Sequence, residues 1–176
     1  MIFRPIYTID TIYHLDPTEL KKMGIKAVFS DLDNTLLAWN IRDSSQEMAI
    51  LNKKLAEAGI KLIVISNNNP ERVSKAVSKF GVAFWANARK PLPFGILKAL
   101  EHYNLSKENV IMVGDQLITD IQAGNLAGVK TVLVKPLVET DKWNTRINRF
   151  FEKIIFFFLN INKKIEFKES LKWMKN

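Results

Sequence analysis

The chain has 176 residues, of which 47% are hydrophobic and 25% charged, so its size and composition fit one globular domain and exclude a disordered tail. It has no cysteine, which excludes disulfides, thiolate metal sites and a cysteine nucleophile, and its two histidines argue against a histidine-rich metal site. The net charge is +8, and residues 141–176 hold nine Lys/Arg against four acids. This basic end indicates an anionic partner, or else a solvated charged face.

The apolar pattern bears on location. The residues after Met1 show no continuous apolar run of the kind found in a signal peptide. The longest apolar run, Ile154 to Leu159, is far shorter than the ~20 residues of a spanning helix. We therefore expect a cytoplasmic protein, with a peripheral position at the inner face of a membrane as the alternative.

The N-terminal residues, 1–24, are the least informative. Ile6, Ile9, Ile12 and Leu15 fit either a cover for a sheet or part of a lipid-facing surface. Residues 16–19, Asp-Pro-Thr-Glu, read as the start of a helix.

Beyond residue 24, five short β-rich runs alternate with segments of helical period. The predicted strands are 27–30, 61–66, 82–86, 110–114 and 131–134, and the predicted helices are 45–58, 70–80, 91–103 and 117–127. This alternation predicts an α/β fold with a parallel sheet covered on both faces. Because the composition becomes aromatic and basic near Thr140, we divide the chain into a core of residues 1–140 and a helical tail of residues 141–176.

Two carboxylates, Asp31 and Asp33, follow the first of these strands. At the carboxyl end of a parallel strand they face the crevice in which α/β sheets bind ligands. Acidic turns after strands are common, so this pattern by itself does not decide between a turn and a site.

Three other strand ends carry polar residues. Ser66 and Asn67 offer a hydroxyl and backbone N–H groups that suit a phosphate oxygen, although taken alone this run is more typical of a turn and N-cap. Lys90, directly before a proline that starts a helix, is placed to bring an ammonium beside a phosphate; the alternative is a surface lysine. Asp115 and Asp120 add two carboxylates, and hard oxygen donors of this kind suit Mg²⁺.

In chain order the four strand ends supply Asp-x-Asp-x-Thr, Ser, Lys-Pro and Gly-Asp-x-x-x-x-Asp. This set resembles the haloacid dehalogenase (HAD) phosphatase superfamily over about residues 25–135. The resemblance implies a three-layer Rossmann-like fold with a five-stranded parallel sheet in the order 3-2-1-4-5. The first and fourth strands are then neighbours, which brings Asp31, Asp33 and Asp115 to the topological switch point.

The resemblance also implies a reaction, the Mg²⁺-dependent hydrolysis of a phosphomonoester. Asp31 is then the nucleophile that forms an aspartyl-phosphate, and Asp33 is the general acid and base. The Mg²⁺ ligands are Asp31, the backbone carbonyl of Asp33, and Asp115. The second Asp of the pair favours phosphoryl transfer, because the dehalogenases of this superfamily lack it.

The remaining motif residues are given supporting roles by the same resemblance. Ser66, the backbone at Asn67, and Lys90 bind the phosphoryl oxygens. Thr35 braces the loop by hydrogen bonding, and Asp120 supports Lys90 or a metal-bound water.

The spacing of the motifs argues against a cap domain. Thirty residues separate Thr35 from Ser66 and 22 separate Asn67 from Lys90, enough for one helix and a short flap in the first case and for one helix and one strand in the second. A capless site is open, which fits a macromolecular or surface-bound substrate. Trp39 lies in the expected flap, where it either contacts substrate or packs against the core.

The tail places aromatic and aliphatic side chains on one helical stripe between residues 143 and 161, with Arg146 and Arg149 beside it. Such a helix lies in a membrane interface, or it docks on the core or on a partner. The Thr-Arg-x-Asn-Arg run at 145–149, with the capless body, resembles the YqeG-type phosphatases of HAD subfamily IIIA. These are similar to the phosphatidylglycerophosphate phosphatases of phospholipid biosynthesis, which implies a lipid-borne phosphate ester and an anionic membrane surface as partners, with Arg146 and Arg149 as contacts.

Two other functions compete with this interpretation. One is a soluble phosphatase of nucleotides or sugar phosphates, but the open site and the apolar tail argue against it. The other is a nucleic-acid-binding or ribosome-associated protein that uses its +8 charge on a HAD scaffold, against which the intact acids count. The sequence leaves the oligomeric state open.

Overall fold

The computed structural model describes residues 2–38 and 44–138. In chain order its elements are β1 (Tyr7–Ile9), η1 (Ile12–His14), α1 (Pro17–Lys22), β2 (Ala27–Ser30), α2 (Ser44–Glu57), β3 (Lys61–Ile65), α3 (Pro70–Val77), η2 (Ser78–Phe80), β4 (Ala83–Trp85), α4 (Phe94–His102), η3 (Lys107–Asn109), β5 (Val110–Gly114), η4 (Leu117–Ile121), α5 (Gln122–Ala127) and β6 (Lys130–Val134). The predicted tail, with Arg146 and Arg149, and the flap residue Trp39 lie outside the described residues.

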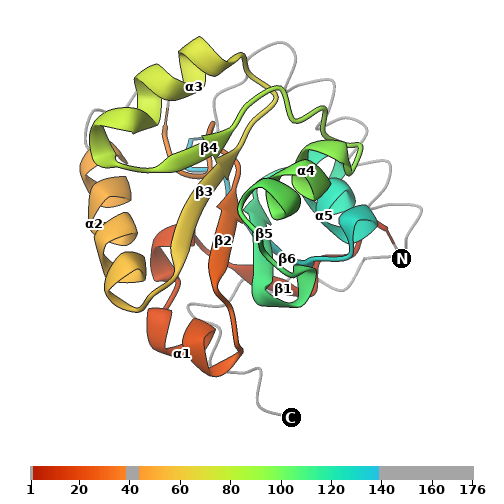
Figure 1. Ribbon diagram of the computed structural model, residues 1–176, viewed down its shortest axis with the longest axis horizontal. Coiled ribbons are helices and arrows are strands. Elements are labelled where there is room, and N and C mark those ends of the chain that lie inside the picture. Colours follow the sequence, from red (N-terminus) through yellow and green to blue (C-terminus); the bar gives the residue numbers. More distant parts are fainter. Residues whose placement is uncertain (1, 39–43, 139–176) are drawn as a thin grey trace.

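All strands of the sheet run parallel, in the order β1-β6-β5-β2-β3-β4. Figure 1 shows this sheet between two helical layers, with α2 and α3 on one side and α4 and α5 on the other. The predicted three-layer fold and strand order are therefore confirmed. The connections from β2 to β3 and from β3 to β4 each carry a single α-helix, α2 and α3, which leaves no cap domain in the described chain.

The sheet has one strand more than the five that were predicted. The sixth strand, β1, pairs with β6 from Tyr7↔Val132 to Ile9↔Val134 and extends the sheet at its edge. It is only three residues long, which is too short to show a period of two in the sequence. Three predicted helices also differ in detail. The segment 70–80 divides into α3 and a 3-10 turn, η2, and α4 begins at Phe94 rather than at residue 91. The segment 117–127 divides into a π-helical turn, η4, and the helix α5.

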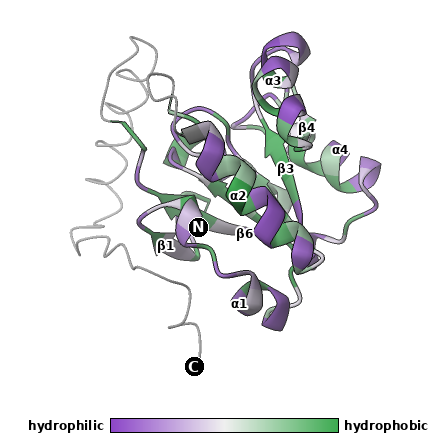
Figure 2. Cartoon of the chain, turned by 90° about the vertical axis from the view of Figure 1, so that its left-hand side faces the viewer, coloured by the Kyte–Doolittle hydropathy of each residue, from purple (hydrophilic) through white to green (hydrophobic). Residues whose placement is uncertain are grey.

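The strands are apolar because both faces of the sheet are buried. Successive residues of β2 alternate between two cores: Val28 lies in the core under α2 and α3, and Ala27 and Phe29 lie in the core under α4. In Figure 2 the strands are largely hydrophobic, whereas α2 and α3 carry hydrophilic residues. Burial on both faces fixes the register of the central strands β2, β3 and β5, since a slip by one residue would exchange the two cores.

The helices begin where the sequence supplies caps. Asp16 caps α1 by accepting from Thr18 N, and Asn69 caps α3 by accepting from Arg72 N. Pro17 and Pro70 occupy the first turns of these helices, where a missing N–H costs nothing. None of the helices in the described ranges is long and apolar enough to cross a bilayer.

The N-terminal segment provides a test of the sixth strand. Ile9 is completely buried in β1, and Ile6, just before this strand, is 50% exposed. We expect Ile9→Ala to lower the free energy of unfolding by about 2–5 kcal/mol, because it leaves a cavity between the edge strand and the core. Ile6→Ala serves as the matched control and should change this free energy by less than about 0.5 kcal/mol. Chemical denaturation measures both, and equal effects of the two variants would contradict the burial of β1.

Candidate active site

The loop that follows β2 carries the first pair of predicted site residues. Asp31 comes directly after the strand, and its backbone N–H donates to the Val113 carbonyl of β5 at 2.9 Å. Leu32 and Leu36 anchor the loop because both are buried in the core. The position of Asp31 is therefore fixed from both sides, by the sheet and by the core.

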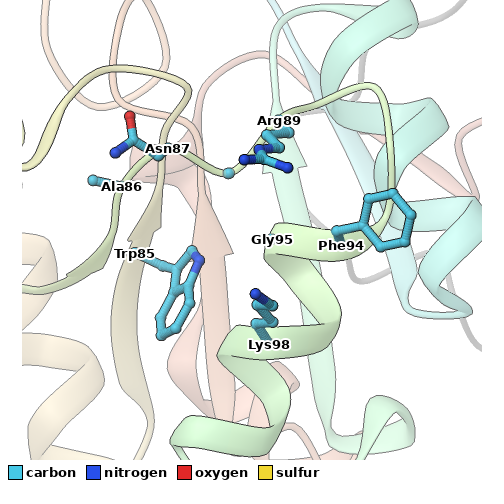
Figure 3. A pocket seen from close by; sticks show the side chains of 8 residues that line it. Trp85, Ala86, Asn87, Arg89, Phe94, Gly95 and Lys98 are labelled. Atoms are coloured by element: carbon cyan, nitrogen blue, oxygen red, sulfur yellow. The ribbon is translucent and has the colours of Figure 1, made fainter.

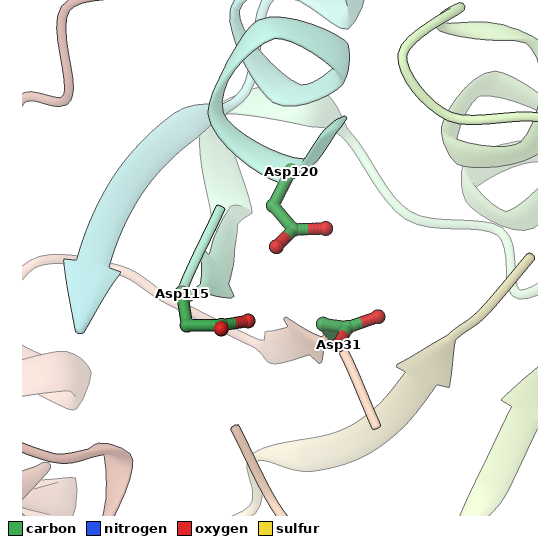
Figure 4. A group of neighbouring side chains, drawn as sticks. All are labelled: Asp31, Asp115 and Asp120. Carbon is green, nitrogen blue, oxygen red and sulfur yellow. The ribbon is translucent and has the colours of Figure 1, made fainter. Parts of the chain in front are cut away.

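Three carboxylates converge at the carboxyl ends of the central strands. Oxygen atoms of Asp31, Asp115 and Asp120 all lie within 4.8 Å of one another, and Figure 4 shows the three side chains pointing toward a common space. Asp31 follows β2, Asp115 follows the adjacent β5, and Asp120 comes from η4. Thr35 Oγ1 donates to Asp115 Oδ1 at 3.2 Å, which ties the β2 loop to the β5 loop.

Glycine at position 114 makes room for this arrangement. A Cβ at Gly114 would lie 2.3 Å from Asp120 Oδ2, which is closer than atoms approach without displacement. The same carboxylate oxygen accepts from the backbone N–H of Gln116 at 3.1 Å. Asp120 therefore folds back over Gly114, and this places it in the cluster although it is five residues from Asp115.

Lys90 is the buried cation of the site. Its Nζ donates to Asp31 Oδ1 and to Asp120 Oδ1, both at 2.7 Å, and its side chain is only 2% exposed. The Asn67 side chain holds the Lys90 backbone from both directions, since Oδ1 accepts from Lys90 N at 2.7 Å and Nδ2 donates to the Lys90 carbonyl at 2.8 Å. The amide that follows β3 thus positions the lysine that follows β4.

Burial and mutual repulsion perturb these charges. Burial raises the pKa of Asp31 to about 7, with a further contribution from the charge of Asp120, although Lys90 opposes both. The pKa of Asp115 is raised well above its usual value, first by burial and then by the charges of Asp120 and Asp31. Burial would lower the pKa of Lys90, but the attraction of Asp120 and Asp31 outweighs it and raises that pKa. Carboxylates with raised pKa values in a polar cluster are typical of functional sites.

The Asp33 side chain belongs to a separate, more exposed group. Arg72 of α3 donates through Nη2 to both Asp33 oxygens, at 2.9 and 3.1 Å, and Asn68 Nδ2 donates to Oδ2 at 2.9 Å. The Asp33 side chain is 41% exposed, compared with 13% for Asp31. The second carboxylate of the Asp-x-Asp pair is therefore within reach of solvent, held by residues from the next strand end and helix.

Ser66 lies directly after β3 and is 1% exposed. Its Oγ accepts from the Asn68 backbone N–H at 3.1 Å and from Asn68 Nδ2 at 3.0 Å. With both of these bonds made to its oxygen, the hydroxyl keeps its own proton available for donation.

The structure therefore brings four of the predicted site residues together, namely Asp31, Lys90, Asp115 and Asp120. Thr35 and Asn67 are in direct contact with this group. Asp33 and Ser66 both form hydrogen bonds with Asn68. Sequence reasoning missed Arg72 and the contact of Asn68 with Asp33. The signal was present for Arg72: Asn69 and Pro70 mark a helix start after β3, so Arg72 lies in the first turn, at the same end of the sheet.

The donor set fits a divalent cation. When the four carboxylates Asp31, Asp33, Asp115 and Asp120 are all ionised, they face only two cations, Lys90 and Arg72, which leaves an excess of two negative charges. All the side-chain donors of the cluster are hard carboxylate oxygens, the ligands that Mg²⁺ and related ions prefer.

A family model described as haloacid dehalogenase-like hydrolase matches residues 3–134, which include all of these side chains. The chain belongs to the haloacid dehalogenase-like hydrolase family. The protein "Probable phosphatase YqeG" of Bacillus subtilis (strain 168) is 35% identical over 167 residues, covering 95% of this chain and 97% of that protein. The prediction of a HAD-type phosphatase is therefore confirmed.

Two further relatives show how far the similarity extends. "Phosphatidylglycerophosphate phosphatase 1, chloroplastic" of Chlamydomonas reinhardtii is 31% identical over 140 residues, which cover 74% of this chain and 52% of the algal protein. This chain thus spans about half of that relative. A crystal structure of an uncharacterized protein from Listeria monocytogenes serotype 4b has a TM-score of 0.53 at 16% identity, covering 67% of this chain and 84% of that one, and it shows the shared fold alone.

The raised pKa of Asp31 predicts an unusual pH dependence of stability. The unfolded chain releases the Asp31 proton near pH 3.8, whereas the folded, metal-free protein keeps it up to about pH 7. The folded state therefore binds more protons between these values, and its stability should fall as the pH rises through this window. Asp31→Asn should reduce this fall by on the order of 2 kcal/mol.

Chemical denaturation in EDTA, from pH 4 to pH 8, measures the effect. Asp115 also has a raised pKa, so Asp115→Asn should reduce the fall as well. Glu57→Gln, at an exposed position at the end of α2, is the control and should keep the wild-type profile. Parallel profiles of wild type and Asp31→Asn would show that Asp31 ionises normally.

Proposed function

We propose that the protein is a Mg²⁺-dependent phosphomonoester hydrolase that works through an aspartyl-phosphate on Asp31. The observation that carries this proposal is the convergence of Asp31, Asp115 and Asp120 within 4.8 Å, with Lys90 bridging two of them at 2.7 Å. Negative charge must be neutralised in phosphoryl transfer, and this site combines acids for a cation with a buried ammonium for the phosphoryl group.

In the first half of the reaction an Asp31 oxygen attacks phosphorus, and the bond from phosphorus to the ester oxygen breaks. The leaving alkoxide takes a proton from the Asp33 carboxyl group. In the second half Asp33 accepts a proton from water as that water attacks phosphorus, and the bond to the Asp31 oxygen breaks. Inorganic phosphate leaves and Asp31 is restored. The exposure of Asp33 suits this role, because its side chain must meet both the leaving group and water.

The residues suited to hold Mg²⁺ are Asp31 and Asp115, with the Asp33 backbone carbonyl as the third protein ligand by family resemblance and Asp120 behind them. A bound Mg²⁺ supplies positive charge that offsets the repulsion between the carboxylates and the phosphate. Lys90, which has three donors and uses two on Asp31 and Asp120, keeps the third for a phosphoryl oxygen. Ser66 Oγ–H and the backbone N–H of Asn67 are the further phosphate donors in this proposal.

For the substrate we propose a lipid-borne phosphomonoester, with phosphatidylglycerophosphate as the specific candidate. Similarity to a phosphatidylglycerophosphate phosphatase over 74% of the chain supports this choice. So does the lack of a cap domain among the described residues between β2 and β4, since an open site accepts a headgroup that stays in a membrane. In this proposal residues 1–140 form the catalytic core, and the tail with Arg146 and Arg149 contacts the lipid surface.

The catalytic assignment predicts large losses of activity on conservative substitution. Asp31→Asn should lower kcat by at least about 10³-fold because it removes the nucleophile, and Asp33→Asn by about 10²–10⁴-fold because it removes the base that accepts a proton from the attacking water. Turnover of p-nitrophenyl phosphate with Mg²⁺ measures both, and circular dichroism verifies the fold. The exposed variant Glu57→Gln should retain wild-type kcat. A folded Asp31→Asn protein with normal turnover would refute the assignment.

Removal of the metal provides a second, independent test. Dialysis against EDTA should abolish phosphatase activity, and Mg²⁺ should restore it, because without the cation the ionised carboxylates would repel one another and the phosphate. Activity that persists in EDTA would exclude a metal-dependent mechanism.

The substrate proposal is tested with a panel of phosphate esters. We expect kcat/KM for phosphatidylglycerophosphate in vesicles or mixed micelles to exceed that for nucleotide and sugar phosphates by at least about tenfold. A soluble ester that is turned over more efficiently than the lipid would favour the soluble phosphatase instead.

A further inference from the structure

The segment from Ala88 to Leu100 combines exposed apolar side chains with positive charge. It contains Arg89, Lys90 and Lys98 and no acidic residue. Three large hydrophobic side chains protrude from it into solvent: Leu92 is 48% exposed, Phe94 54% and Leu97 44%. Only seven large hydrophobic side chains are exposed in the described part of the chain, so this cluster of three is unusual.

Arg89 and Lys98 are the exposed cations of this segment. Arg89 and Lys98 form no ion pair within the described residues. Both line a hollow of about 470 Å³ together with Trp85 and Phe94. In Figure 3 Arg89 overhangs this hollow from the loop before α4, while Lys98 enters it from the helix. The nearest acid along the helix, Glu101, lies one turn beyond Lys98 and away from the active-site end.

This surface is rigidly joined to the active site. Arg89 precedes Lys90 directly, and its positive φ of 58° turns the chain between the two residues. Helix α4 packs tightly beneath the loop, because a Cβ at Gly95 would lie 2.4 Å from the Ala88 carbonyl oxygen. Asn67 holds the Lys90 backbone from the other side. Whatever docks on this surface is therefore held at a fixed position relative to Lys90.

We propose that Arg89, Leu92, Phe94, Leu97 and Lys98 form a docking face for an anionic phospholipid bilayer. The three apolar side chains enter the interfacial region, and the two cations contact lipid phosphates. Protruding apolar residues next to two cations that have no ion pair among the described residues match a surface that is apolar inside and anionic outside, whereas a nucleic acid offers no apolar layer for Leu92 and Leu97. The inference rests on the proposed function, since docking here presents a headgroup phosphate to the neighbouring catalytic site.

A position-specific probe tests this face in the full-length chain. The absence of cysteine allows a single environment-sensitive fluorophore to be attached at Phe94→Cys, with Ile50→Cys as the matched control. Ile50 is 55% exposed and lies on α2, in the helical layer on the other side of the sheet (Figure 1). With vesicles of phosphatidylglycerol and phosphatidylcholine, the probe at 94 should shift to the blue and brighten, and the probe at 50 should not. Pure phosphatidylcholine vesicles should give a much smaller change at 94.

A functional readout separates this proposal from the catalytic one. Turnover of vesicle-borne phosphatidylglycerophosphate, divided by turnover of p-nitrophenyl phosphate, should fall by on the order of tenfold in Phe94→Glu and stay at the wild-type ratio in Ile50→Glu. Arg89→Gln with Lys98→Gln should lower the affinity for anionic vesicles in flotation.

The outcomes distinguish the two ideas. If the fluorescence of the probe at position 94 does not change with vesicles, the proposed docking face is wrong, whether or not the protein floats with them. The protein then either binds vesicles through another surface or does not bind them. If the wild-type protein does not hydrolyse p-nitrophenyl phosphate, the proposed function is wrong instead. A fluorescence change at position 94 would then still show that this face binds the bilayer.

Discussion

The double ion pair of Lys90 with Asp31 and Asp120 is the interaction on which the site depends. Three carboxylates at adjacent strand ends repel one another in a poorly solvated space, and the ammonium that lies 2.7 Å from two of them offsets part of this repulsion. A buried ion pair is a weak source of stability, since desolvation opposes the attraction. Its value here is positional: it fixes Asp31 beside Asp120 and leaves an excess of negative charge that a bound divalent cation would offset.

The fold supplies this arrangement because the sheet is parallel. Each of β2, β3, β4 and β5 ends at the same edge, so residues separated by up to 89 positions in the sequence, from Asp31 to Asp120, meet without long connections. Close backbone approach completes it, since the bare Gly114 lets Asp120 fold back into the cluster. The cost of the acidic site is offset by the two apolar cores on either side of the sheet.

The parts that the sequence predicted are those with a strong local pattern. The strands 27–30 and 110–114 were placed to the residue, because continuous apolar runs flanked by polar turns identify buried parallel strands. The parallel order and the meeting of Asp31 with Asp115 followed from the HAD motifs. Strand β1 was missed because three residues carry too little pattern, and the link between Arg72 and Asp33 was missed because it is a tertiary contact of two exposed side chains.

The loop from β4 to α4 connects the chemistry of the site to the surface around it. Two consecutive residues of this loop lie in opposite environments. Lys90 is buried among carboxylates, and Arg89 is exposed above a hollow lined by aromatic side chains. In the proposed docking, a headgroup bound by Arg89 lies close to Lys90, because the two residues are adjacent in the chain, and this proximity lowers the entropic cost of bringing its phosphate to Asp31. The described residues contain no cap domain to confine the substrate, and in this proposal a bilayer held against α4 supplies that confinement.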